Sequence, residues 1–159
     1  RMRHYRVSVY VLCVCLFLTL LLAGYSLWQR YQPLEFTCKA TFVQHHEDEN
    51  LYVSLTYRIS KDSGMLSMNG RSLTNGANKF NRKIFFNIEK RNNVYHLHSV
   101  NNVVFPDETV NNSWLEKYEP MFFVYPQKDI YVKILEQQNS YLFIFSTLPA
   151  YVCHKQKGL

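Results

Sequence analysis

Two groups of histidines hold the residues of this chain whose types and spacing are suited to chemistry. His96 and His98 are two residues apart, so both imidazoles would leave the same face of a strand, a spacing that some metal sites use. The run from His45 to Glu49 offers further nitrogen and oxygen ligands, although a polar run between two strands is typical of a solvated turn. Because nothing nearby completes either ligand set, we predict that the chain binds no metal and no cofactor.

Motifs of common nucleophilic and phosphate-binding sites are missing from the sequence. It contains no Gly-x-Ser-x-Gly, no glycine-rich phosphate loop and no His-Glu-x-x-His. The adjacent acids Asp107 and Glu108 are explained as residues that start a helix. We therefore predict that the protein is not an enzyme. A membrane-anchored hydrolase stays open as an alternative, and its site would need His96, His98 and the acids of the 45–49 turn.

An uncharged run from Val7 to Trp28 is long enough to span a bilayer. As a helix it would be about 33 Å long, close to the thickness of the hydrocarbon core. A cleavable signal peptide would have an apolar region of only about 7–15 residues. Tyr25 also stands where a lipoprotein cleavage box beginning at Leu21 would need a cysteine. The run therefore predicts a transmembrane helix that stays on the protein.

Charge around this helix predicts its orientation, because basic residues favour the cytoplasmic side of a membrane. Four of the 18 Lys and Arg lie before Tyr31, whereas all 12 Asp and Glu lie after it. The exported part is thus nearly neutral, which argues against direct binding of nucleic acid. The predicted order is a basic cytoplasmic tail, a transmembrane helix, a linker and an exported domain, at residues 1–6, 7–28, 29–34 and 35–159.

The cysteines agree with an exported domain. Cys13 and Cys15 lie within the apolar run, where they are predicted to be ordinary small apolar residues. Cys38 and Cys153 lie beyond it, and two cysteines in an oxidising space usually pair. Their disulfide would close a loop of more than 100 residues. In the chain-entropy model such a bridge stabilises a fold by roughly 4–5 kcal/mol.

Alternation of apolar and polar residues predicts a mainly β domain with a small antiparallel barrel or a strongly curved sheet. About seven strands are separated by turn signals at regular distances. They are predicted at 35–42, 51–59, 65–73, 80–90, 94–100, 130–136 and 141–148. One short helix is predicted between Asp107 and Glu119, and Pro120 would stop it.

Aromatic residues are abundant, with 12 Tyr and 11 Phe, many of them in the predicted strands. Their simplest role is to fill the core. A sufficiently wide barrel can instead enclose a lipid-like ligand among such side chains, and an open strand edge can pair with another chain. The residues alone leave these three possibilities open.

The order of features along the chain carries a resemblance to a known family. The features are a basic N-terminus with one membrane helix, Phe36-Thr37-Cys38, the run from Gly64 to Gly70, Met121-Phe122-Phe123 followed by Pro126, and the ending from Tyr141 to Cys153. In this order they resemble the FidL-like family of small inner-membrane proteins of Gram-negative bacteria. The resemblance implies a bacterial inner membrane, with the exported domain in the periplasm.

The resemblance also implies the small partner of a co-component signalling pair, such as ToxR with ToxS or VtrA with VtrC. There the other chain is a ToxR-like membrane-bound transcription regulator with a winged helix, and the small partner binds its periplasmic domain as a heterodimer. In the VtrA with VtrC pair the small partner is a lipocalin-like barrel, and the two chains form a chamber that accepts bile salts. Six cytoplasmic residues would be too few for an output domain, so we expect any signal to pass through the partner.

We therefore predict an apolar pocket for a bile salt or another amphipathic ligand. Alternation alone selects its candidate lining residues, which are Phe36, Phe42, Phe80, Phe86, Tyr95, Phe143 and Phe145. The alternative function is a stand-alone membrane-anchored lipid-binding or envelope assembly protein without a signalling role.

Overall fold

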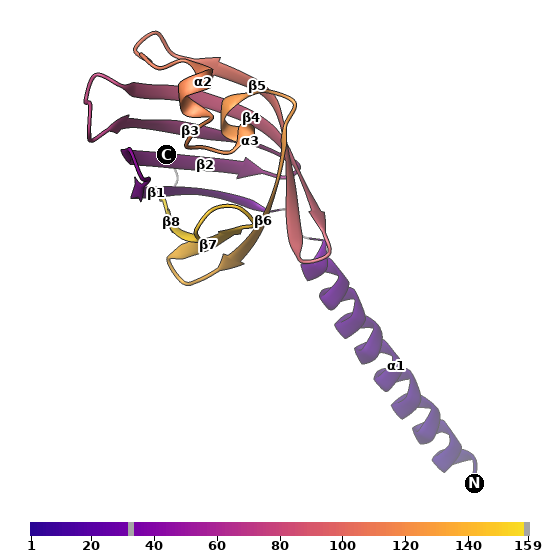
Figure 1. Ribbon diagram of the computed structural model, residues 1–159. Coiled ribbons are helices and arrows are strands. Elements are labelled where there is room, and N and C mark those ends of the chain that lie inside the picture. Colours follow the sequence, from indigo (N-terminus) through magenta and orange to yellow (C-terminus); the bar gives the residue numbers. More distant parts are fainter. Residues whose placement is uncertain (32–33, 158–159) are drawn as a thin grey trace. The chain divides into compact units, whose positions relative to one another are not determined.

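The computed structural model describes residues 1–31 and 34–157, and the chain divides into two compact units, residues 1–33 and 34–159. The first unit is helix α1, Met2–Arg30, which is long and apolar enough to cross a membrane (Figure 1). It contains the predicted span at 7–28 and extends beyond it at both ends. The predicted linker at 29–34 is thus partly helical, and its residues 32 and 33 lie outside the described residues.

The second unit is a closed barrel of eight antiparallel strands, each paired with the next in chain order and the last with the first (Figure 1). The strands are β1 Glu35–His45, β2 Asn50–Ser60, β3 Ser63–Ser72, β4 Lys79–Arg91, β5 Val94–Val104, β6 Asp129–Glu136, β7 Ser140–Phe145 and β8 Tyr151–Lys155. The predicted mainly β class is confirmed. The number of strands is one higher than expected, because β8 was not predicted.

Alternation explains why the sequence forms this barrel. In β2, the side chains of every second residue from Leu51 to Ile59 are buried, while Tyr52 and Arg58 face outward. Strands β3, β4 and β7 repeat the pattern, and their inward side chains form one continuous apolar core. Burial of such side chains is the main free-energy gain of a domain of this size.

The neighbouring strands are joined over very different lengths. The β1–β2 ladder pairs Glu35 with Ser60 and continues to His45 with Asn50. In contrast, β5 pairs with β6 at four positions, and β8 pairs with β1 only at Cys38 with Lys155 and Lys39 with His154. The predicted Cys38–Cys153 disulfide is formed at this last junction, with a Cα–Cα distance of 5.3 Å. We call the β8–β1 junction the seam.

A crossover segment, residues 105–128, connects β5 to β6. It contains two short helices, α2 Asn112–Leu115 and α3 Met121–Val124, in place of the single helix predicted from Asp107 to Glu119. The helix begins late because Asn111 caps α2, its side chain accepting a hydrogen bond from the Trp114 N–H at 2.9 Å. Pro120, expected to stop a helix, is the N-cap of α3.

The acids Asp107 and Glu108 were interpreted as helix-start residues, and this prediction was wrong. Glu108 accepts two hydrogen bonds from the fully buried Arg82 of β4, at 2.9 Å from Nε and 2.7 Å from Nη2. Arg82 Nη1 also donates to the Val124 carbonyl at 3.2 Å. This buried ion pair therefore fastens the crossover segment to the barrel, and Asp107 accepts from the Asn81 side chain instead of starting a helix.

Candidate ligand-binding site

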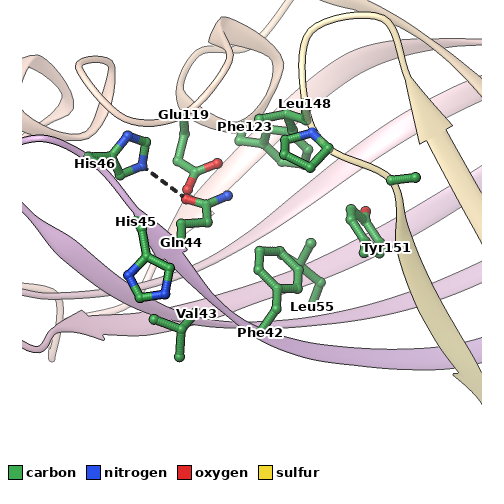
Figure 2. Close-up of a pocket in the computed structure, with 12 residues that line it drawn as sticks. Phe42, Val43, Gln44, His45, His46, Leu55, Glu119, Phe123, Leu148 and Tyr151 are labelled. Carbon is green, nitrogen blue, oxygen red and sulfur yellow. Dashed lines mark hydrogen bonds between the residues drawn. The ribbon is translucent and has the colours of Figure 1, made fainter.

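A cavity opens where the seam ends. Past Lys39, the described part of β1 makes no further pair with β8. A cavity of about 440 Å³ occupies this place, between the end of β1 and the segment from Leu148 to Tyr151 (Figure 2). Its lining residues are Phe42, Val43, Gln44, His45, His46, Leu55, Glu119, Phe123, Leu148, Pro149, Ala150 and Tyr151.

One wall of the cavity is aromatic and apolar. The Phe42 and Tyr151 rings stack with centroids 5.1 Å apart, and Leu55 lies beside them (Figure 2). The Tyr151 hydroxyl is hydrogen-bonded to the Tyr57 hydroxyl. Burial raises the pKa of both phenols, so the two hydroxyls stay neutral and one donates to the other. This wall thus offers a ligand an uncharged, largely apolar surface.

The opposite end of the cavity is polar and contains Glu119, Gln44 and His46. The Glu119 carboxyl points toward the Gln44 amide, whose Oε1 lies 3.5 Å from His46 Nε2 (Figure 2). Glu119 is only 6% exposed, and its Oε1 has no hydrogen-bond partner among the described residues. A buried polar atom without a partner costs free energy, so an unsatisfied oxygen in a cavity is a functional candidate.

Burial also determines the charge of Glu119. Removal from water raises the pKa of its carboxyl to about 8, although the neighbouring Gln44 amide opposes the rise. At neutral pH most of the carboxyl is therefore protonated and able to donate a hydrogen bond. The Gln44 and His46 side chains complete a small polar region at one end of an apolar cavity.

The seven aromatic residues predicted to line a pocket lie in different places. Phe42 lines the cavity, and Phe36 lines a separate, more open depression near the other end of β1. Tyr95 is half-buried and packs against the core. Four lie within the core itself: Phe80, Phe86, Phe143 and Phe145. The structure therefore brings Phe42 to the cavity but not the other six.

Sequence reasoning missed Glu119, Phe123 and the segment that precedes β8. A local signal was present, because Glu119 is an acid directly before Pro120 and the apolar run Met121-Phe122-Phe123. Phe122 and Phe123 pack inside the barrel, against Phe86 and Phe145. Because Phe122 and Phe123 are buried, the nearby Glu119 is buried as well.

The other chemical candidates form a separate cluster at the surface, in which Asp129 is exposed and both histidines are half-buried. Asp129 Oδ1 accepts hydrogen bonds from His96 Nε2 at 2.7 Å and from His98 Nδ1 at 2.8 Å. The hydrogen bond to Asp129 raises the pKa of His98, and the hydrogen bonds from His98 and His96 lower the pKa of Asp129. These histidines line a different depression from His45 and His46, and no group of three metal-ligating side chains occurs in the described ranges.

The expected solvated turn from His45 to Glu49 is only partly solvated. Glu49 is buried, and it accepts a hydrogen bond from the Ser72 hydroxyl. His46 packs against the Tyr118 ring, whose hydroxyl donates to Asp48 at 3.2 Å. The turn thus anchors the crossover segment next to the cavity, and Glu119 belongs to that same segment.

Comparison with known families adds one match, which covers most of the barrel. The model of the YqeJ C-terminal domain matches residues 35–153. The chain belongs to this family. No curated protein matches the chain. The YqeJ C-terminal domain match begins with the first residue of β1 and ends at Cys153, so it contains both bridged cysteines and every residue that lines the cavity.

Proposed function

We propose that this YqeJ C-terminal domain is a periplasmic co-component that binds an amphipathic ligand and a membrane-bound transcription regulator. The observation that carries the proposal is the apolar cavity at the seam, with one buried carboxyl at its polar end. No step of this function requires catalysis by the chain. The anchor is α1, and the disulfide suits an oxidising compartment such as the periplasm.

The cavity supports a small amphiphile as ligand. Its volume of about 440 Å³ lies in the range typical of small-molecule sites, about 300–1,000 Å³. Phe42, Tyr151 and Phe123 offer flat apolar walls, which suit a rigid ring system or a chain. Bile salts combine a rigid apolar body with a charged head, and the exposed His45 lies at the rim where such a head would meet solvent.

The seam supports a protein partner. Past Lys39, the edge of β1 that faces β8 has no strand pair among the described residues, and an unpaired edge is a template for another chain. Val43 and Val152, on the outer surface of β1 and β8, are each 41% exposed. We propose that the periplasmic domain of a ToxR-like regulator binds here, which agrees with the resemblance to FidL-like and ToxS-like proteins.

Ligand and partner would then be coupled by linkage. A ligand that binds the heterodimer more tightly than the separate chains stabilises the heterodimer and shifts its population. Because the cavity opens at the proposed partner surface, one bound molecule contacts both chains. The regulator's own DNA-binding domain would supply the output.

The test uses the full chain in lipid nanodiscs, with and without the regulator's periplasmic domain, and taurodeoxycholate as the probe. We expect a one-to-one heterodimer whose dissociation constant falls when the bile salt is added, measured by interferometry. Ala150→Trp fills the mouth of the cavity and is expected to weaken bile-salt binding at least tenfold. Ala77→Trp, at an exposed turn between β3 and β4, is the matched control. Equal binding by both variants would place the ligand elsewhere.

A stand-alone lipid-binding or envelope assembly role is the second candidate. It is favoured by the closure of the barrel within one chain, through the β8–β1 pairs and the disulfide, so that the cavity exists without a partner. The same experiment separates the two functions. Tight bile-salt binding that the regulator domain leaves unchanged would support the stand-alone role.

A further inference from the structure

We propose that Glu119 is the polar anchor of the cavity and that it binds, in its protonated form, a hydroxyl or carbonyl oxygen on the apolar body of the ligand. This inference deepens the proposed function, on which it rests, by naming the group that the ligand must present. It also makes ligand binding dependent on pH, because a ligand carbonyl oxygen, or a hydroxyl whose hydrogen is donated to Gln44 Oε1, needs the protonated carboxyl as its donor.

Geometry is the first support. The Glu119 Oε1 atom is buried, lacks a partner among the described residues and belongs to a side chain that lines the cavity. The carboxyl lies beside the Gln44 amide at the polar end, away from the stacked Phe42 and Tyr151 rings (Figure 2). A ligand hydroxyl placed there could accept from Glu119 and donate to Gln44 Oε1. The site is thus matched to a neutral oxygen.

The surrounding charges favour a neutral carboxyl. Facing Glu119 are Gln44 from β1, His46 in the turn after it, Tyr57 from β2 and Tyr151 from β8, with Tyr118 next to Glu119 in the chain. The residues that line the described cavity include no Lys or Arg that could pair with an ionised carboxylate. A pKa of about 8 agrees with this arrangement. Ligands with a cationic group at this depth would need an ionised Glu119, which the surroundings disfavour.

The pH dependence has a definite size. If only protonated Glu119 binds the ligand, the apparent dissociation constant rises in inverse proportion to the protonated fraction of Glu119. For a pKa of about 8, affinity is close to its maximum at pH 6.5 and about 30-fold lower at pH 9.5. Taurine-conjugated bile salts are suitable probes, because their sulfonate stays ionised throughout this range and does not add a titration of its own.

The binding experiment compares taurodeoxycholate with taurocholanate, which has the same body without ring hydroxyls, on the full chain in nanodiscs at pH 6.5 and 9.5. Wild type should prefer the hydroxylated probe at pH 6.5 and lose that preference at pH 9.5. Glu119→Gln keeps an N–H donor and should retain the preference at both pH values. Glu119→Leu should abolish it, with at least a tenfold loss for taurodeoxycholate only.

Control variants distinguish the pH effect of Glu119 from effects of neighbouring residues. Glu47→Gln changes an exposed acid of the adjacent turn and should leave the pH profile of wild type unchanged. A His45→Gln, His46→Gln double variant removes both imidazoles that line the cavity and should also keep the loss of binding at pH 9.5. A pH profile that survives in Glu119→Gln would overturn the proposal.

The protonation state of the Glu119 carboxyl can be measured directly, without any ligand. Infrared difference spectra between wild type and Glu119→Gln should contain the carbonyl band of a protonated carboxylic acid at pH 6.5, and this band should disappear by pH 9.5. An ionised Glu119 at pH 6.5 would overturn the proposal whatever the protein binds. Conversely, the protein could contain a protonated Glu119 and yet bind neither probe. That result would agree with the inferred protonation of Glu119 but would overturn the bile-salt part of the proposed function.

Discussion

The first five strands of the barrel and the last three are built differently. Strands β1 to β5 have 10 to 13 residues each and form long, continuous ladders. Strands β6, β7 and β8 have only eight, six and five residues. The short group joins the long one at two narrow places, four pairs between β5 and β6 and two pairs at the seam.

The difference shows how a small barrel can close and still keep a cavity. Long ladders fix the shape of the first group, because each added pair satisfies backbone groups that would otherwise be unpaired. The short strands leave room at the end of β1, where the cavity lies. At the seam a covalent bond accompanies the two strand pairs, and the buried Arg82 side chain holds the crossover segment against β4.

The largest effect should come from opening the seam. Replacing both bridged cysteines by Ala in the full chain should lower the free energy of unfolding by roughly 4–5 kcal/mol, since the bridge closes a loop across a sequence separation of 115. Urea denaturation followed by circular dichroism measures this change. The matched control replaces Cys13 and Cys15, which are free and lie in α1, and should not change the barrel transition. Equal stability of both variants would contradict the role given to the seam.

The next effect concerns the crossover segment. Arg82→Ala leaves Glu108 buried without its cation, which typically costs about 3–5 kcal/mol. Arg91→Ala, which removes an ion pair exposed at both partners, should cost less than about 1 kcal/mol. The free energy of unfolding of both variants is measured by urea denaturation of the disulfide-bonded chain. Combining Arg82→Met with Glu108→Leu should recover part of the loss, and a double variant no better than Arg82→Ala would show that the charge pair is not the cause.

The smallest effect is expected at the β5–β6 junction, where His98 contacts Asp129 on the surface. This contact raises the pKa of His98 and lowers that of Asp129, so it stabilises the fold below the ordinary histidine pKa near 6.5 and loses that contribution as pH rises through the pKa of folded His98. Asp129→Asn should move the His98 pKa down toward its ordinary value in an NMR titration. Asp48→Asn, in the β1–β2 turn, should not move it. An unchanged His98 in Asp129→Asn would exclude the contact.

The strands with strong alternation could be predicted from the sequence, because burial on one face of a sheet imposes a period of two. From Leu51 to Ile59 every second residue is apolar, and β2 indeed buries that face. The disulfide was predicted because two cysteines lie in a domain that is expected to be exported. By contrast, β8 has five residues and follows the turn-like segment around Pro149, so no alternation was long enough to reveal it.

The cavity could be predicted only in part. Phe42 was expected because it shares a face with Cys38 and Ala40. Phe143 and Phe145 share a strand face in the same way, yet they fill the core, because aromatic alternation does not distinguish a cavity wall from packed interior. Glu119 ends the segment that is predicted as one helix. Its burial depends on contacts with residues far away in the chain, such as those that Phe122 and Phe123 make.

The position of the disulfide also sets the order in which the protein matures. Cys38 is made early and its partner only 115 residues later, so at typical synthesis rates the first thiol waits roughly 6 to 23 seconds for the second. During that time the long strands can already pair with their neighbours, since each contacts the next in the chain. We expect the disulfide to form last, after the final strand has been made, so that a cell's thiol oxidation machinery would control when the barrel is covalently closed beside the cavity.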